Sequence, residues 1–232
     1  MSEQPFADHF SRSAADYAAH RPRYPIELFA WLAGLPARCG LTWDCGTGNG
    51  QAAVGIAGYF DRVVATDASA AQLAEAEPHP RVTYRVASAG RSGPPFFDEV
   101  RRVLAPGGVI AAWTYRGATL DEPALTHTIE TFMLETMGPY WASARRFVND
   151  GYRSIPFPFV ELAAPPFTMA AAWTLDELLR YVATWSAVGR YRAEQGRDPM
   201  PALEAELLTG WGPKERRRWA TWPISVRAGR AG

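Results

Sequence analysis

The sequence is poor in cysteine. Among its 232 residues only Cys39 and Cys45 carry thiols, and neither stands in a CxxC or Cys/His pattern. Structural metal sites need several such ligands at short spacing, so we expect no metal centre. Two isolated cysteines are typical of a protein in a reducing compartment. We therefore predict a cytoplasmic protein whose thiols are reduced and buried.

Long apolar runs and an excess of charge are also absent. No stretch approaches the ~20 apolar residues of a membrane span, and the opening MSEQPFADHF lacks the basic and apolar regions of a signal peptide. Lysine plus arginine and aspartate plus glutamate both number 24, so the formal net charge is zero. Nucleic-acid binding normally needs a basic excess. We expect neither a membrane nor a nucleic-acid partner, and a monomer or homodimer.

What the sequence does contain is a regular alternation of short apolar runs and amphipathic stretches. This alternation indicates βαβ units, so we predict an α/β, Rossmann-like doubly wound sheet in a single domain over residues 1–232. The expected strands are 41–45, 62–66, 81–87, 109–114 and 219–227. The expected helices are 51–58, 69–77, 96–104 and 200–210, with further helices beginning at Pro25, Pro123 and Thr174. Residues 159–169 are expected to be extended.

The most informative stretch is DCGTGNG at 44–50, directly after the first expected strand. Its glycines allow a tight turn from strand to helix and let a ligand approach the backbone closely. Amides at the start of the following helix are free to donate hydrogen bonds. The spacing is GxGxG, with Gln51 where a dinucleotide-binding GxGxxG has its third glycine, and the GK[ST] of a phosphate-binding loop is absent.

An acidic residue, Asp67, ends the second expected strand. A carboxylate at this place is able to accept hydrogen bonds from both hydroxyls of a ribose. The glycine turn and this acid, on adjacent strands, together favour an adenosine ligand. The alternative is a glycine-rich turn beside an aspartate that merely caps a helix.

Three segments resemble motifs of class I S-adenosylmethionine-dependent methyltransferases: DCGTGNG at 44–50, DASAAQL at 67–73 and LAPGG at 104–108. HFS at 9–11, Tyr17, RP at 21–22, YP at 24–25 and WTY at 113–115 are similar to the methyltransferase type 11 group related to trans-aconitate methyltransferase. The resemblance covers nearly the whole chain, although many subfamilies share the segments at 44–50 and 104–108.

The resemblance implies S-adenosylmethionine as cofactor and assigns roles to particular residues. The cofactor-binding set is Tyr17, Arg21, Asp44, Gly46, Thr47, Gly48, Gly50, Asp67, Ala68, Gln72, Ser88 and Ala89. In this set Asp44 would hold the amino group and Asp67 the ribose, while Ser88 and Ala89 would lie beside adenine. Residues 1–24 would form an arm over the cofactor, and 119–210 a partly helical region on the acceptor side.

One departure from the family pattern concerns the middle of the sheet. The family has a fourth parallel strand, followed by a loop that lines the acceptor pocket, before the helix that leads to 104–108. Here only GRSGPP at 90–95 joins the third strand to that helix, and this linker is too short and too rich in glycine and proline for a core strand. Either the sheet re-pairs, with 109–114 beside 41–45, or a segment is missing.

The acceptor side offers cations and aromatic residues but no catalytic triad. Methyl transfer needs mainly the positioning of the acceptor, and a carboxylate acceptor needs a cation and no general base. The candidate cations are Arg21, Arg116, Arg145 and Arg146, and the candidate pocket walls are Trp113, Tyr115, Trp141 and Trp185. We predict methyl transfer to a small molecule, with a carboxylate as the candidate acceptor. The alternatives are a non-catalytic cofactor-binding protein and a nicotinamide-dependent oxidoreductase.

Overall fold

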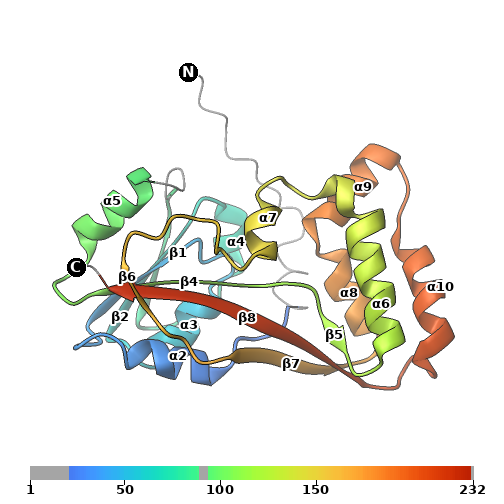
Figure 1. The fold of residues 1–232 in the computed structure, drawn as a ribbon, viewed down its shortest axis with the longest axis horizontal. Coiled ribbons are helices and arrows are strands. Elements are labelled where there is room, and N and C mark those ends of the chain that lie inside the picture. Colours follow the sequence, from blue (N-terminus) through green and yellow to red (C-terminus); the bar gives the residue numbers. More distant parts are fainter. Residues whose placement is uncertain (1–20, 89–93, 231–232) are drawn as a thin grey trace.

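The protein has an α/β fold, shown in Figure 1 as a computed structural model that describes residues 21–88 and 94–230. Parallel strands and their connecting helices occupy one end of the molecule, and a group of helices occupies the other. A long C-terminal strand runs between the two ends (Figure 1). The glycine turn, which follows β1, therefore belongs to the first end, and the aromatic, helical part of the chain belongs to the second.

The first sheet is parallel, with the order β1-β2-β3. Its strands are β1 (Leu41–Cys45), β2 (Arg62–Asp67) and β3 (Val82–Val86), and helix α2 (Ile26–Ala33) precedes them. Helix α3 (Gln51–Ala57) connects β1 to β2, and α4 (Ala70–Ala74) connects β2 to β3. Val63 lies opposite Thr42 on one side and Val82 on the other, so β2 is paired along both edges. The order of elements predicted for this half is confirmed.

The second sheet is built around one strand, β8 (Arg218–Arg230). Four strands pair with β8 in antiparallel register: β4 (Val109–Tyr115), β5 (Thr119–Leu120), β6 (Val160–Leu162) and β7 (Phe167–Trp173). Strand β8 is longer than the predicted 219–227. The extended stretch predicted at 159–169 is two strands, β6 and β7, on opposite sides of the segment 163–166.

The two sheets do not join. Among the described residues β1 pairs only with β2, and β4 pairs with β8. The re-pairing of β4 beside β1, one of the two arrangements left open by the sequence, is therefore wrong. Leu41 is 59% exposed and Trp43 is 38% exposed, values far above those of a strand covered on both faces. The fourth strand of the family pattern has no counterpart in the described part of this chain.

Helix α5 (Pro94–Val103) follows the short linker, most of which, 89–93, lies outside the described residues. The helix packs away from β1. The Phe97 ring lies 6.1 Å from that of Phe157 and 5.7 Å from that of Phe159, and Arg101 donates a hydrogen bond to the carbonyl oxygen of Pro158 at 2.9 Å. Helix α5 thus leads the chain to β4 along the segment before β6.

Most of the remaining helical elements gather at the end of the molecule opposite β1–β3, and one, formed by residues 145–149, lies nearer the middle (Figure 1). They are α6 (Pro123–Thr131), a π-helical turn η2 (Phe132–Thr136), a 3-10 turn η3 (Gly138–Tyr140), α7 (Arg145–Asn149), α8 (Leu175–Ala183), α9 (Ser186–Gln195) and α10 (Met200–Trp211). The helix start predicted at Thr174 is confirmed, and a capping box forms there: Glu177 N donates to Thr174 Oγ1 at 3.3 Å, and Thr174 N donates to Glu177 Oε2 at 2.8 Å.

Aromatic side chains hold the helical end against β8. Trp222 is fully buried, and its Nε1 donates to the hydroxyl of Tyr181 at 3.1 Å. The Trp173 ring packs edge-on against Trp222 at 4.9 Å. Because the buried indole N–H has a partner, the core keeps its apolar contacts without an unsatisfied donor.

No helix in the described ranges is long and apolar enough to cross a membrane.

Candidate functional site

The glycine turn lies between β1 and α3, and its shape requires glycine. Gly46, Gly48 and Gly50 have φ values of 76°, 56° and 82°, in the left-handed region that side chains with a Cβ rarely adopt. The amides of Gly46 and Thr47 donate to the carbonyl oxygen of Thr66 at 2.8 and 3.0 Å. The end of β2 therefore fixes the turn that follows β1.

The three glycines face different surroundings. A Cβ at Gly50 would lie 2.3 Å from the hydroxyl oxygen of Tyr84 on β3, so this glycine is required by packing. A Cβ at Gly46 would have no atom within 4 Å, and Gly46 is exposed. The backbone at Gly46 is thus open to a ligand, whereas the Gly50 side of the turn is filled by Tyr84.

Asp67, at the end of β2, is hydrogen-bonded to the turn. Its Oδ2 accepts a hydrogen bond from the amide of Gly48, and its Oδ1 accepts one from the amide of Ser69, both at 2.8 Å. An ionised carboxylate has about four acceptor sites, so each oxygen keeps capacity for one further donor. Asp67 is half-buried and remains accessible to a hydroxyl-bearing ligand.

A second carboxylate, that of Asp44, lies on the other side of the turn. Thr47 Oγ1 donates to Asp44 Oδ2 at 2.5 Å. Burial raises the pKa of Asp44 above its usual 3.8; the hydrogen bond from Thr47 acts against this, and the charge of Asp67 adds to it. Because burial and the neighbouring carboxylate both disfavour the ionised form of Asp44, a cation bound beside the turn would stabilise that form.

Some of the other residues predicted to bind the cofactor lie close to this turn. Ser69 accepts a hydrogen bond from the amide of Gln72 at 3.3 Å and so caps α4, near the start of the helix predicted at 69–77. The side-chain oxygen of Gln72 lies 3.7 Å from the Cβ position of Gly48. Ala68 is half-buried next to Asp67, and Ser88 is exposed just past β3. Tyr17 and Ala89 lie outside the described residues.

Arg21 connects the N-terminal segment to β4. Its Nη1 donates to the hydroxyl of Tyr115 at 3.0 Å, and its guanidinium lies 5.1 Å from the ring centroid of Tyr181. The Tyr24 ring packs edge-on against the rings of Trp113 and Tyr115 at 6.0 and 6.3 Å. Arg21 is half-buried and not an exposed surface cation.

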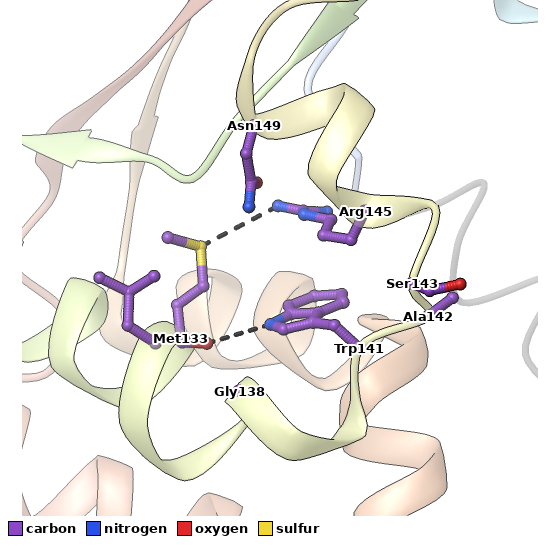
Figure 2. Close-up of a pocket in the computed structure, with 8 residues that line it drawn as sticks. Met133, Gly138, Trp141, Ala142, Ser143, Arg145 and Asn149 are labelled. Atoms are coloured by element: carbon purple, nitrogen blue, oxygen red, sulfur yellow. Dashed lines mark hydrogen bonds between the residues drawn. The ribbon is translucent and has the colours of Figure 1, made fainter. Parts of the chain in front are cut away.

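A cavity of about 290 Å³ opens in the helical region beyond β4. Figure 2 shows its lining: Met133, Leu134, Gly138, Trp141, Ala142, Ser143, Arg145 and Asn149. Of the four aromatic residues predicted as pocket walls, Trp141 alone is in this lining. Trp185 packs behind Trp141 with the ring centroids 5.7 Å apart, while Trp113 and Tyr115 contact Tyr24.

The candidate cations Arg116, Arg145 and Arg146 differ in whether they line the cavity. Arg145 lines the cavity, whereas Arg116 and Arg146 are exposed and do not. Arg146 stacks on Phe147 at 4.7 Å. The sequence could not separate these three arginines, since none stands in a motif. Only the path of the chain around η3 and α7 brings Arg145 inward.

The described histidines and cysteines offer little for metal binding or nucleophilic catalysis. No group of three potential metal ligands is present among them. His79 accepts a hydrogen bond from the amide of Arg81, and His127 lies on the exposed face of α6. Cys39 and Cys45 are free thiols and half-buried, so the prediction of buried thiols was too strong. Burial raises the pKa of Cys45 to about 11, which makes it a poor nucleophile.

Comparison with known proteins gives no match to a family model. A solved structure, "Putative Type II Methyltransferase" from Anaeromyxobacter dehalogenans, is 40% identical and superimposes with a TM-score of 0.82, covering 90% of this chain and 97% of that one. A "Putative methyltransferase" of Dictyostelium discoideum is 26% identical, over 89% of this chain and 87% of its own. "Methyltransferase cfoB" of Aspergillus candidus is 25% identical, over 92% and 82%.

The alignment with the Dictyostelium protein extends over 231 positions but takes in only 89% of this 232-residue chain, so that protein has residues without a counterpart here. The identity with the Anaeromyxobacter structure, its coverage of both chains and the shared fold establish the family. The chain belongs to the S-adenosylmethionine-dependent methyltransferases and has their class I α/β fold.

Proposed function

We propose that the protein transfers a methyl group from S-adenosylmethionine to a small carboxylate-bearing molecule. One observation carries the proposal: the carboxylates of Asp44 and Asp67 flank a glycine turn whose backbone is open at Gly46. A sulfonium compound with an amino group and a ribose suits these two carboxylates, because it brings positive charge and hydroxyl donors to two acceptors.

The same pair of carboxylates argues against a nicotinamide dinucleotide. The pyrophosphate of such a ligand is anionic and would lie at the glycine turn, beside Asp44. Two nearby carboxylates repel that charge. The spacing of the turn, with Gln51 in place of the third glycine, points the same way.

In this proposal Gly46 and Gly48 pass beside the amino-acid part of the cofactor, Asp44 holds its amino group, and Asp67 accepts the ribose hydroxyls. When bound, S-adenosylmethionine supplies the methyl group: a lone pair of the acceptor forms the new bond to carbon while the bond from carbon to sulfur breaks and its electron pair stays on sulfur. A carboxylate acceptor is already deprotonated near neutral pH, so this chain needs no base for that step. His127 is exposed and His79 is half-buried and accepts a hydrogen bond from the amide of Arg81, so neither is placed here as a base.

A second candidate function is cofactor binding without turnover. The separation between β1 and β4 favours it, because no described strand pairs with the second edge of β1, and Leu41 and Trp43 on one face of β1 are exposed. Methyl transfer relies on the exclusion of water and on precise positioning, both of which depend on a closed site.

The test is a calorimetric titration of the purified chain with S-adenosylhomocysteine and, separately, with NADH. The proposal expects saturable binding of the first and none of the second. Turnover is then measured as transfer of a labelled methyl group from S-adenosylmethionine to small carboxylic acids. Failure to bind S-adenosylhomocysteine would reject the proposal, while binding with no transfer to any acid would favour the non-catalytic candidate.

A further inference from the structure

The cavity beside α7 has a polarised lining with one formal charge. Its apolar groups are Met133, Leu134 and the indole of Trp141, and its polar groups include the guanidinium of Arg145 and the amide of Asn149 (Figure 2). None of the residues in the lining is acidic. At about 290 Å³ the cavity suits a small ligand rather than a nucleotide.

The helix end that forms this cavity is distorted. After α6 the chain widens into the π-helical turn η2, and then tightens into η3 at Gly138 and Pro139. The carbonyl oxygen of Met133, in η2, accepts a hydrogen bond from Trp141 Nε1 at 3.0 Å. This bond fixes the plane of the indole, and π-helical turns of this kind frequently mark functional sites.

Arg145 is held by the aromatic plane rather than by an opposite charge. Its guanidinium carbon lies 4.2 Å from the ring centroid of Trp141, and Nη2 lies 4.0 Å from the sulfur of Met133. No carboxylate forms an ion pair with Arg145 within the described ranges. Stacking on an indole leaves the edge of the guanidinium, with its forked donors, available to a planar anion.

The electrostatic surroundings point in the same direction. Burial lowers the pKa of Arg145, and the charged or ionisable groups that act on it are Tyr181, Arg21, Tyr115 and Tyr152. Two of them, Tyr115 and Tyr181, also contact Arg21. Two guanidinium groups thus share a neighbourhood at the end of β4 in which the other groups are phenols. A bound anion would offset this concentration of positive charge.

We propose that Arg145, oriented by Trp141, determines acceptor specificity by binding a carboxylate joined to a small apolar body in this cavity. The carboxylate accepts two hydrogen bonds from the guanidinium edge, and the apolar body lies against Met133 and Leu134. The inference rests on the proposed function for its place in the reaction, but binding at the cavity is measurable without turnover. Arg145 is here a specificity residue of the acceptor side, separate from the glycine turn and Asp67.

The test measures binding of three acids, benzoate, phenylacetate and hexanoate, with their neutral amides as matched controls. Each is titrated into the full chain with and without saturating S-adenosylhomocysteine. The proposal expects at least one acid to bind and its amide to bind about 10- to 100-fold more weakly, since a hydrogen bond to a charged group is lost. Equal affinity for acid and amide, or no binding of any acid, would overturn the inference.

Three variants assign the effect to Arg145. Arg145→Gln is expected to weaken acid binding about 10- to 100-fold and to leave amide binding unchanged, and Arg145→Lys to restore part of the affinity because it keeps the charge. Arg146→Gln removes the adjacent exposed guanidinium and is expected to change nothing. Wild-type acid affinity in Arg145→Gln would contradict the proposal.

S-adenosylhomocysteine affinity, measured on the same variants, separates the two hypotheses. Unchanged affinity in Arg145→Gln shows that the variant is folded and that its effect is confined to the acceptor side. If the wild-type chain binds the acids but not S-adenosylhomocysteine, the proposed function fails while the carboxylate site stands. If it binds S-adenosylhomocysteine but no acid, the carboxylate-site inference fails while the cofactor-binding part of the proposed function stands.

Discussion

The backbone amide of Gly48 donates a hydrogen bond to Asp67 Oδ2 at 2.8 Å, so the acid at the end of β2 holds the turn at the end of β1. The carboxylate therefore has a structural role before any ligand binds. It shapes the turn in which Gly46 stays open while Gly50 is closed off by Tyr84. The predictions on the glycines follow from this difference between the two ends of one turn.

Gly50→Ala is expected to destabilise the protein more than Gly46→Ala. Both positions have a positive φ, which costs an alanine about 1 kcal/mol. At Gly50 the new Cβ also overlaps the Tyr84 ring, an added cost of ~1–3 kcal/mol for overpacking. Urea unfolding of the two variants measures the difference. Equal losses of stability would mean that Tyr84 moves aside without cost.

Gly46→Ala, in contrast, is expected to affect ligand binding more than stability. Its Cβ meets no protein atom within 4 Å, but it stands on the open face of the turn where the cofactor would approach the backbone. Calorimetry with S-adenosylhomocysteine should show a loss of affinity of at least tenfold. Wild-type affinity would show that the ligand does not approach this face.

Asp44→Asn is expected to stabilise the ligand-free protein at neutral pH. The folded state raises the pKa of Asp44, chiefly through burial, so ionisation of this group disfavours folding once the pH exceeds its unfolded value near 3.8. Below that pH the carboxyl is protonated in both states and the effect disappears. Thermal unfolding should show a higher midpoint for the variant at pH 7 and a difference that shrinks as the pH falls.

The same variant should bind S-adenosylmethionine more weakly, because it removes one of the two negative charges beside the turn. A gain in stability together with a loss of affinity is the expected signature of a group kept for binding. If Asp44→Asn lowers both, the carboxylate serves the fold instead.

The predictability of the fold depended on whether the relevant contacts are local in sequence. Thr174 and Glu177 predicted the start of α8, since a capping box is closed by residues three apart. The turn at 44–50 was predictable because only glycine tolerates its backbone angles. Helix α9 was missed: its first residue follows Trp185, which provides no side-chain cap, and buried Ala187, Val188 and Tyr191 give only a weak apolar stripe.

The candidate site was predictable on the cofactor side and not on the acceptor side. Asp67 ends a strand next to a glycine turn, a pattern that is visible in the sequence. Its hydrogen bond to Gly48 was not foreseen, because it joins residues from two strands. Arg145 could not be separated from Arg146, since their difference arises from the packing of Trp141 and Met133 around η2.

The edge of β1 that no strand of the described residues covers predicts a distinct pattern of hydrogen exchange. In a parallel sheet alternate amides point to opposite edges, so those of β2 are hydrogen-bonded on both sides while about half of those in β1 face outward. NMR-detected exchange should show fast-exchanging amides alternating with protected ones from Leu41 to Cys45. Uniform protection along β1 would mean that another segment covers this edge.

The ion pair of Arg218 and Asp121 is expected to matter more than exposed pairs do. Arg218 is buried and donates to Asp121 Oδ1 at 3.3 Å and to the carbonyl oxygens of Trp211 and Gly210. Asp121→Asn leaves the buried guanidinium without its counter-charge, at a cost of about 1–2 kcal/mol after allowance for the partial exposure of Asp121. Glu99→Gln, in the exposed pair with Arg102, is the matched control and should leave urea unfolding unchanged.

The central claim is that Asp67 and the turn it holds form the cofactor site. The most direct measurement is calorimetric titration of S-adenosylhomocysteine into the wild-type chain, Asp67→Ala and Asp61→Ala, the last removing an exposed acid just before β2. We predict saturable binding by the wild type and Asp61→Ala, and a loss of at least tenfold in Asp67→Ala. Equal affinity in all three proteins would contradict the account.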